Sequence, residues 1–217
     1  MSCDIVLVGV GGQGVLTIGD LLLRAAFAAD VPASFRPTKG MAQRGGFVKV
    51  ELRLGREDVG PRIGEGGADL VVAMERSEAL NGLPYAKPNG TVLLFDHVWK
   101  PTGVLLGVDP YPTRKQVVEA IRATAMRLIL LDPDDLPVTD GRPVRSNVYV
   151  LGAMLGVSRL ADLLDLALVK QVIADRWPKA AVSNREAFRA GLSSKRLASG
   201  ASLGRSPSGE RQPGESK

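Results

Sequence analysis

A glycine-rich turn near the amino terminus has the residue types and spacing of an anion-binding loop. It contains Gly9, Gly11, Gly12, Gln13 and Gly14. An apolar run precedes it and an amphipathic stretch follows, which is the order strand, turn, helix. Glycine carries no Cβ, and the N–H groups and dipole at a helix start favour a negative group. The loop is therefore predicted either to hold a phosphate-bearing ligand or to allow close strand–helix packing, which also demands glycines.

A second segment, residues 39–46, combines two cations, an amide and three glycines within eight residues. Its candidate residues are Lys39, Gln43, Arg44, Gly45 and Gly46. The guanidinium of Arg44 offers paired donors that suit a phosphate or a carboxylate, while the glycines leave backbone N–H groups accessible. This mixture favours a ligand-binding or interface role over a plain connector.

The region where a dinucleotide-binding fold places an acidic residue, about 20 positions after the loop, reads Ser34-Phe35-Arg36. An arginine suits the 2′-phosphate of NADP or the 3′-phosphate of coenzyme A. A solvated loop arginine explains the position equally well, so all three interpretations of Arg36 stay open.

Metal and nucleophile chemistry has few candidates in this chain. Cys3 is its only cysteine and His97 its only histidine. One cysteine excludes an internal disulfide and cannot supply an iron–sulfur cluster or a structural zinc site. A surface or packing role is favoured for His97. Tyr111 and Lys115 have the spacing of a reductase Tyr-x-x-x-Lys pair, but the flanking prolines keep Tyr111 out of a regular helix.

The elements that must position these residues alternate along the chain. Apolar runs predict strands at residues 3–10, 33–35, 47–54, 70–74, 91–95 and 103–108. Helical periodicity predicts helices at residues 15–29, 77–83 and 113–131, and two or three helices between 147 and 192. The resulting fold class is α/β: a doubly wound, mostly parallel, Rossmann-like sheet with C-terminal helices.

Composition predicts one domain over residues 1–192 and a disordered basic tail over 193–217. The tail from Ser194 onward carries five basic and two acidic residues, so it supplies most of the net charge of +5. Nucleic acid is therefore not an expected partner. No apolar run is long enough to span a membrane, and no signal region precedes the first strand. Both points predict a cytoplasmic location.

Residues 9–16 followed by 40–46 resemble the gamma-type domain of the 2-oxoacid:ferredoxin oxidoreductases. Within that group the pattern is most similar to the small (beta) subunit of the indolepyruvate-type enzymes. Later pieces at 67–70, 75–80, 146–153 and 184–188 fit as well, so the likeness spans residues 3–192. Phe47 departs from the pattern, because a small residue is more usual after the double glycine. A bulky side chain at this position can reshape the pocket, which leaves the choice of substrate open.

The resemblance implies a subunit, not active alone, of an enzyme that converts an aryl 2-oxoacid and coenzyme A to an acyl-CoA, CO₂ and reduced ferredoxin. It implies that a large (alpha) partner carries thiamine diphosphate with Mg and the iron–sulfur clusters. This chain alone then binds none of these tightly. Gln43 and Arg44 become the catalytic candidates, with Arg44 orienting an anionic group. Two other hypotheses are a free-standing NADP-dependent reductase and a non-catalytic assembly module.

Overall fold

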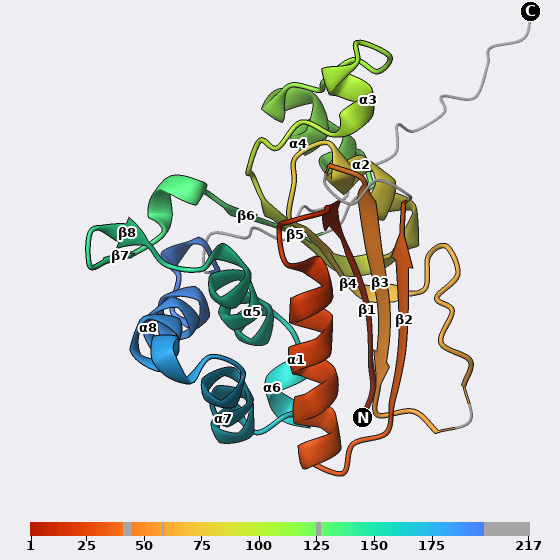
Figure 1. Ribbon diagram of the computed structural model, residues 1–217. Helices are drawn as coiled ribbons and strands as arrows, with labels where there is room; N and C mark the ends of the chain where they lie inside the picture. Colours follow the sequence, from red (N-terminus) through yellow and green to blue (C-terminus); the bar gives the residue numbers. More distant parts are fainter. Residues whose placement is uncertain (41–44, 58, 125–126, 198–217) are drawn as a thin grey trace, which may run out of the picture.

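A six-stranded sheet forms the centre of the molecule in the computed structural model, which describes residues 1–40, 45–57, 59–124 and 127–197 (Figure 1). The strand order is β2-β3-β1-β4-β5-β6. The pairs β1–β4, β4–β5 and β5–β6 are parallel. Strand β3 runs antiparallel to both of its neighbours, β1 and β2. The strands are β1 (Cys3–Val10), β2 (Ala33–Lys39), β3 (Phe47–Leu54), β4 (Ala68–Ala73), β5 (Ala86–Phe95) and β6 (Arg127–Leu131). The predicted α/β fold class with a mostly parallel sheet is confirmed.

Helices cover both faces of the sheet because β1 buries side chains on both. Ile5 and Leu7 belong to one core cluster, and Val6 and Val8 to the other, as the two-residue period of a strand dictates. The larger layer contains α1 (Val15–Ala28), α5 (Ser146–Val157), α6 (Leu160–Leu163), α7 (Leu166–Arg176) and α8 (Ala181–Leu192) (Figure 1). The opposite layer contains α2 (Glu78–Gly82) and α4 (Arg114–Ala123).

Short elements complete the described part of the chain. The 3-10 helices are η1 (Leu83–Tyr85), η2 (Pro133–Asp135), η3 (Pro178–Ala180) and η4 (Lys195–Leu197). A small hairpin joins β7 (Val138–Thr139) to β8 (Arg142–Pro143), and the four-residue helix α3 (Thr102–Leu105) lies in the connection after β5.

Two predicted elements differ from the structure. The helix expected over 113–131 starts correctly, with Thr113 as its capping residue, but α4 ends at Ala123 and the apolar run from Arg127 is strand β6. A five-residue apolar run has no period that separates strand from helix, and its parallel pairing with β5 decides. The strand expected over 103–108 is also wrong, because Thr102–Leu105 is helical.

Other boundaries moved. β2 extends to Lys39 and tolerates Pro37 because it is an edge strand. β5 begins at Ala86, and its pairing with β4 shifts register before Leu70. The C-terminal region folds into four α-helices rather than two or three.

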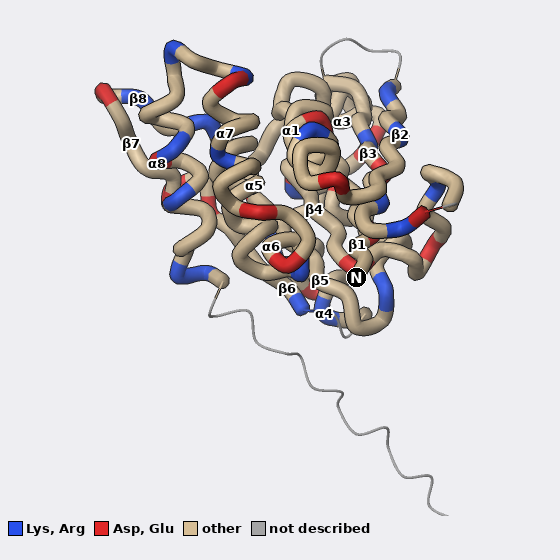
Figure 2. Tube along the Cα trace, turned by 90° about the horizontal axis from the view of Figure 1, so that it is seen from below, with Lys and Arg blue, Asp and Glu red and all other residues tan. Residues whose placement is uncertain are grey.

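The tail and the charge distribution bear on possible partners. Residues 195–197 form η4, and Arg127 donates a hydrogen bond to the carbonyl of Leu197 at 3.1 Å. Residues 198–217, most of the predicted tail, lie outside the described part of the chain. Figure 2 shows basic and acidic residues interspersed along the trace in that view. Within the described residues, no helix has both the length and the apolar character needed to cross a membrane.

Candidate functional site

The glycine loop lies at the carboxyl end of β1 and begins helix α1. Gly12 and Gly14 have φ angles of 109° and 83°, a region that L side chains rarely adopt. Gly14 is the N-cap of α1, and no side chain caps the helix. Gly9 serves packing instead, because a Cβ there would lie 2.8 Å from the Val15 side chain. Close strand–helix packing, one of the two predicted reasons for glycine, therefore operates at Gly9, while Gly12 and Gly14 provide a left-handed backbone.

The side-chain amide of Gln13 holds this loop in place. The backbone N–H of Val10 donates to its Oε1 at 2.9 Å, and its Nε2 donates to the carbonyl of Met74 at 2.7 Å. These two backbone partners fix which way the amide faces. Gln13 Nε2 also lies 3.4 Å from His97 Nδ1. An amide nitrogen only donates, so a hydrogen bond between these two atoms requires Nδ1 to accept and the ring proton to be on Nε2.

The two sequence motifs meet in the folded chain. The N–H of Gly11 donates to the carbonyl of Gly46 at 2.8 Å, and the N–H of Gly45 lies 3.4 Å from the carbonyl of Gly11. On the other side, the N–H of Gly40 donates to the carbonyl of Phe47 at 2.8 Å. Residues 41–44 lie outside the described residues, so Gln43 and Arg44 are not placed. The residue that follows this segment, Gly45, contacts the glycine loop, and the residue that precedes it, Gly40, contacts the first residue of β3.

A cavity of about 560 Å³ opens next to these contacts. The loop, the first turn of α1 and the end of β2 supply its lining: Val10, Gly11, Gly12, Gly14, Val15, Leu16, Thr17, Lys39, Gly40 and Val48. Lys39 and the glycine loop therefore line the same cavity. Phe47 is not among these lining residues. Instead it packs against the core cluster on the other face of the sheet.

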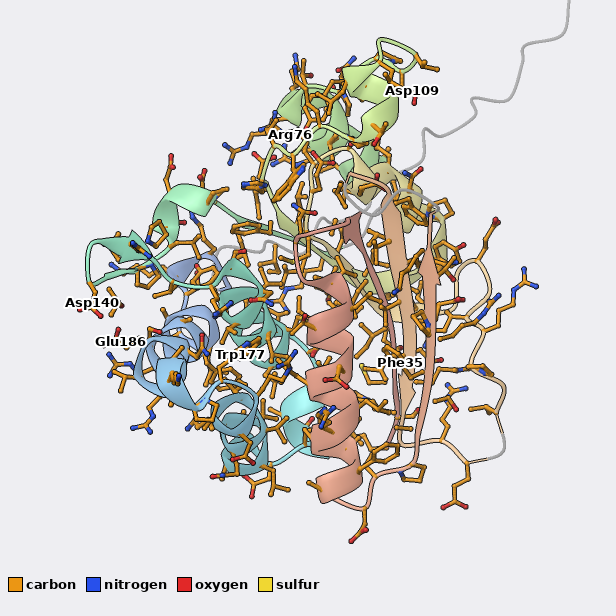
Figure 3. The ribbon with its side chains drawn as sticks, in the orientation of Figure 1. Phe35, Arg76, Asp109, Asp140, Trp177 and Glu186 are labelled. Atoms are coloured by element: carbon orange, nitrogen blue, oxygen red, sulfur yellow. The ribbon has the colours of Figure 1, made fainter. Side chains whose placement is uncertain are left out.

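A second cavity, of about 450 Å³, lies on the other side of the loop. Its lining comes from the glycine loop, α1, the end of β5 and the residues after it, the start of α5 and the end of α7. The residues are Gly12, Gln13, Gly14, Thr17, Phe95, His97, Trp99, Arg145, Ser146, Asn147, Arg176 and Trp177. Sequence reasoning missed Arg145, Arg176 and Trp177. No motif marks them, and only the folding of α5 and α7 against α1 brings them to the loop. Figure 3 labels Trp177 between these helices.

Arg36 lies in strand β2 and forms an ion pair, although 45% of its side chain is exposed. Its guanidinium lies 3.1 Å from a carboxylate oxygen of Glu51, a fully buried residue. Glu51 also accepts from the backbone N–H of Ile63 at 2.9 Å. Arg36 thus compensates a buried charge, a role that needs no phosphate ligand.

Tyr111 and Asn147 each form a hydrogen bond that the sequence does not reveal. Tyr111 lies outside a helix, as predicted, and its hydroxyl donates to buried Glu75. Burial, followed by this hydrogen bond, raises the pKa of Tyr111, which makes the phenol a poor proton donor for a reductase. Asn147 lies inside the first turn of α5 rather than at its cap, and its Oδ1 accepts from Val148 N–H at 3.0 Å.

Cys3 is buried in β1. Burial, then the carboxylates of Asp69 and Asp4, raises the pKa of its thiol to about 12. A thiol with this pKa stays protonated at neutral pH and is a poor nucleophile and metal ligand. The described residues contain no cluster of His, Cys, Asp and Glu side chains that suits a metal ion.

Comparison with known proteins assigns the chain to a family. The family model described as "Pyruvate ferredoxin/flavodoxin oxidoreductase" matches residues 4–194. The chain belongs to this family. Its relative named indolepyruvate oxidoreductase subunit IorB, from Archaeoglobus fulgidus, is 38% identical over 157 residues, which are 72% of this chain and 77% of the relative.

Solved structures share the fold. Pyruvate oxidoreductase subunit PORC of Thermotoga maritima has a TM-score of 0.65 at 19% identity, covering 88% of this chain and 94% of that one. The 2-oxoglutarate:ferredoxin oxidoreductase of Magnetococcus marinus has a TM-score of 0.59 at 18% identity. The match covers 94% of this chain but only 32% of that chain. The same fold thus occurs as a separate subunit and as one third of a longer chain.

Proposed function

We propose that this chain is the small subunit of an oxidoreductase that decarboxylates an aryl 2-oxoacid of the indolepyruvate type. Coenzyme A is the co-substrate, and the products are an aryl acyl-CoA, CO₂ and reduced ferredoxin. The name of the Archaeoglobus fulgidus relative supports the substrate class. The Magnetococcus marinus enzyme, solved with 2-oxoglutarate, coenzyme A and succinyl-CoA bound, supports the reaction class.

The observation that carries the proposal is the meeting of the two motifs at the carboxyl end of β1. Gly11 and Gly46 are joined by a backbone hydrogen bond of 2.8 Å beside an open cavity of about 560 Å³. Ligands of open α/β sheets bind at this end of the strands. We assign the start of α1 and the cation of Lys39 the role of binding an anionic group there. We assign Arg44 the role of orienting that group, either the 2-oxoacid carboxylate or a phosphate of coenzyme A.

The redox chemistry belongs to a large (alpha) partner subunit in this proposal. The single cysteine of this chain is buried and its thiol stays protonated, so the donor set does not suit an iron–sulfur cluster. Thiamine diphosphate with Mg, bound by the partner, supplies the electron sink for decarboxylation. The residues of this chain bind and orient the acid or the coenzyme A at the shared surface.

Anaerobic co-expression with the large subunit tests the proposal. We expect a brown complex that reduces ferredoxin only when indolepyruvate and coenzyme A are both present, and neither subunit active alone. Pyruvate and 2-oxoglutarate serve as comparison substrates at the same concentration. A colourless, separate chain that binds NADPH contradicts the proposal. A complex whose kinetic constants do not change when the glycine loop is substituted favours the assembly-module hypothesis.

A further inference from the structure

The cavity of about 450 Å³ on the α5 side of the glycine loop has the composition of a binding site that the sequence motifs do not mark. It lies where α1 and α5 both begin, and it contains both tryptophans of the chain, Trp99 and Trp177. Two arginines, Arg145 and Arg176, come from the residue before α5 and the last residue of α7.

The charge in this cavity has one sign. No aspartate or glutamate is among its lining residues. Within the described part of the chain, neither arginine has a carboxylate within ion-pair distance, although Arg36, Arg53, Arg76 and Arg114 all do. Instead, the guanidinium carbons of Arg145 and Arg176 lie 4.9 and 5.5 Å from the centre of the Trp177 ring. Stacking on an indole fixes a guanidinium without neutralising it.

The histidine and the two helix starts offer further donors. A hydrogen bond from Gln13 Nε2 to His97 Nδ1 requires the ring proton of His97 to be on Nε2. Neither α1 nor α5 has a side-chain cap or an acidic residue in its first turn, so neither helix start is neutralised by the chain itself. Two exposed arginines stacked near one indole, a histidine and two uncapped helix starts therefore line a cavity that has no aspartate or glutamate among its lining residues.

We propose that this cavity binds a phosphate group of a small organic ligand. A phosphate carries up to two negative charges and three acceptor oxygens, which matches two arginines and several N–H donors better than a single carboxylate does. The cavity is much larger than a phosphate ion, and Trp99 supplies an apolar surface for the rest of the ligand. The source is either the nucleotide part of coenzyme A, which rests on the proposed function, or a separate phosphorylated metabolite.

Intrinsic fluorescence of the full-length chain tests this proposal directly, because every tryptophan of the chain lines the cavity. Titration with pyrophosphate is expected to give a saturable fluorescence change that weakens as ionic strength rises. Adenosine 3′,5′-bisphosphate and pantetheine distinguish the sources. If coenzyme A is the source, the bisphosphate binds more tightly than pyrophosphate and pantetheine gives no change. If a different metabolite is the source, the two phosphates bind alike.

Two variants and a matched control separate the site from general charge. Arg145→Gln and Arg176→Gln are each expected to weaken pyrophosphate binding at least tenfold. Arg122→Gln removes an exposed arginine from α4, on the other face of the sheet, and is expected to leave the affinity unchanged. Circular dichroism confirms that each variant is folded, and the Trp99→Phe background isolates the signal of Trp177.

The outcomes are distinguishable from those of the proposed function. Saturable binding that both arginine variants abolish supports the site even if the complex uses no coenzyme A. No saturable change, or an equal loss in Arg122→Gln, overturns the phosphate site while leaving the proposed reaction standing. Loss of the subunit complex in Arg145→Gln without any pyrophosphate binding also overturns it, because the arginines then meet carboxylates of the partner.

Discussion

Glycines in the loop at residues 9–14 and glycines between α5 and α8 are used in opposite ways. Gly12 and Gly14 are in the left-handed region of φ, and cavities open on both sides of them. Gly152 and Gly191 lie inside helices, where a Cβ would be 2.1 Å from the carbonyl oxygen of Phe188 and 1.9 Å from that of Tyr149. The loop uses glycine for backbone conformation and access, whereas the helix pair uses it for close approach.

The difference teaches where a substitution will act. At Gly12 the nearest atom to an added Cβ is a ring carbon of Trp99, at 3.3 Å, and a side chain can turn aside. Between α5 and α8 the nearest atoms belong to backbone, which moves only if the helices separate. Changes in the loop are therefore expected to alter binding more than stability, and changes between the helices to alter stability alone.

Gly191→Ala is expected to have the largest effect. The added methyl would overlap backbone atoms of Tyr149 and Ala153 in α5, so α8 must shift away from the larger core. Overpacking of this kind costs about 3 kcal/mol or more of unfolding free energy. Chemical denaturation of the full chain measures it. Gly64→Ala is the matched control, because a Cβ at Gly64 meets nothing within 4 Å. Equal stability of the two variants would disprove the close-approach explanation.

Gly14→Ala is expected to cost about 2 kcal/mol, from the φ angle of 83° and from a contact with Asn147. The contact is with the end of a side chain, 2.5 Å from the added Cβ. The double variant Gly14→Ala, Asn147→Ala removes the contact but keeps the strained φ. We expect Gly14→Ala to weaken pyrophosphate binding, and the double variant to regain part of the lost stability but none of that affinity. Full recovery of both would mean that backbone conformation is irrelevant in the loop.

Arg44→Ala tests substrate binding by a substitution that changes no core residue. In the reconstituted complex we expect the KM for indolepyruvate or for coenzyme A to rise roughly tenfold, which is the scale of one charge-assisted hydrogen bond. Arg36→Ala is the matched change, because its partner Glu51 is fully buried in the sheet. That variant should lower the melting temperature and leave both KM values unchanged. Unchanged kinetics in Arg44→Ala contradict the role assigned to it.

Local signals in the sequence were enough for the part of the fold that carries the loop. The apolar run of β1, the alternation of β3 and the period of α1 all lie where predicted. They failed for residues 127–131, because the run continues the apolar pattern of α4 and only pairing with β5 makes it a strand. The periodicity of a short segment does not reveal which distant strand it will pair with.

The candidate site was predicted to a similar extent. Short motifs in the sequence mark the glycines, Gln13 and Lys39. The structure brings Lys39 and both ends of residues 41–44 close to the glycine loop. Arg145, Arg176 and Trp177 come from helices more than 130 residues downstream in the printed sequence. Their arrival at the loop depends on the packing of α5 and α7 against α1, which no motif expresses.

Asn184 in α8 offers the smallest change and the finest test of the helix pair. Its side chain is fully buried, and within the described residues neither its nitrogen nor its oxygen has a hydrogen-bond partner. An unpaired buried amide costs about 1 kcal/mol or more relative to an apolar group of similar shape. Asn184→Leu should therefore raise the unfolding free energy by about 1 kcal/mol, and Asn184→Asp, which buries a charge, should lower it. Calorimetry of the three chains measures both. If Leu destabilises α8 instead, the amide has a partner, such as an internal water molecule, and the contact with α5 is then held by polar groups as well as by glycines.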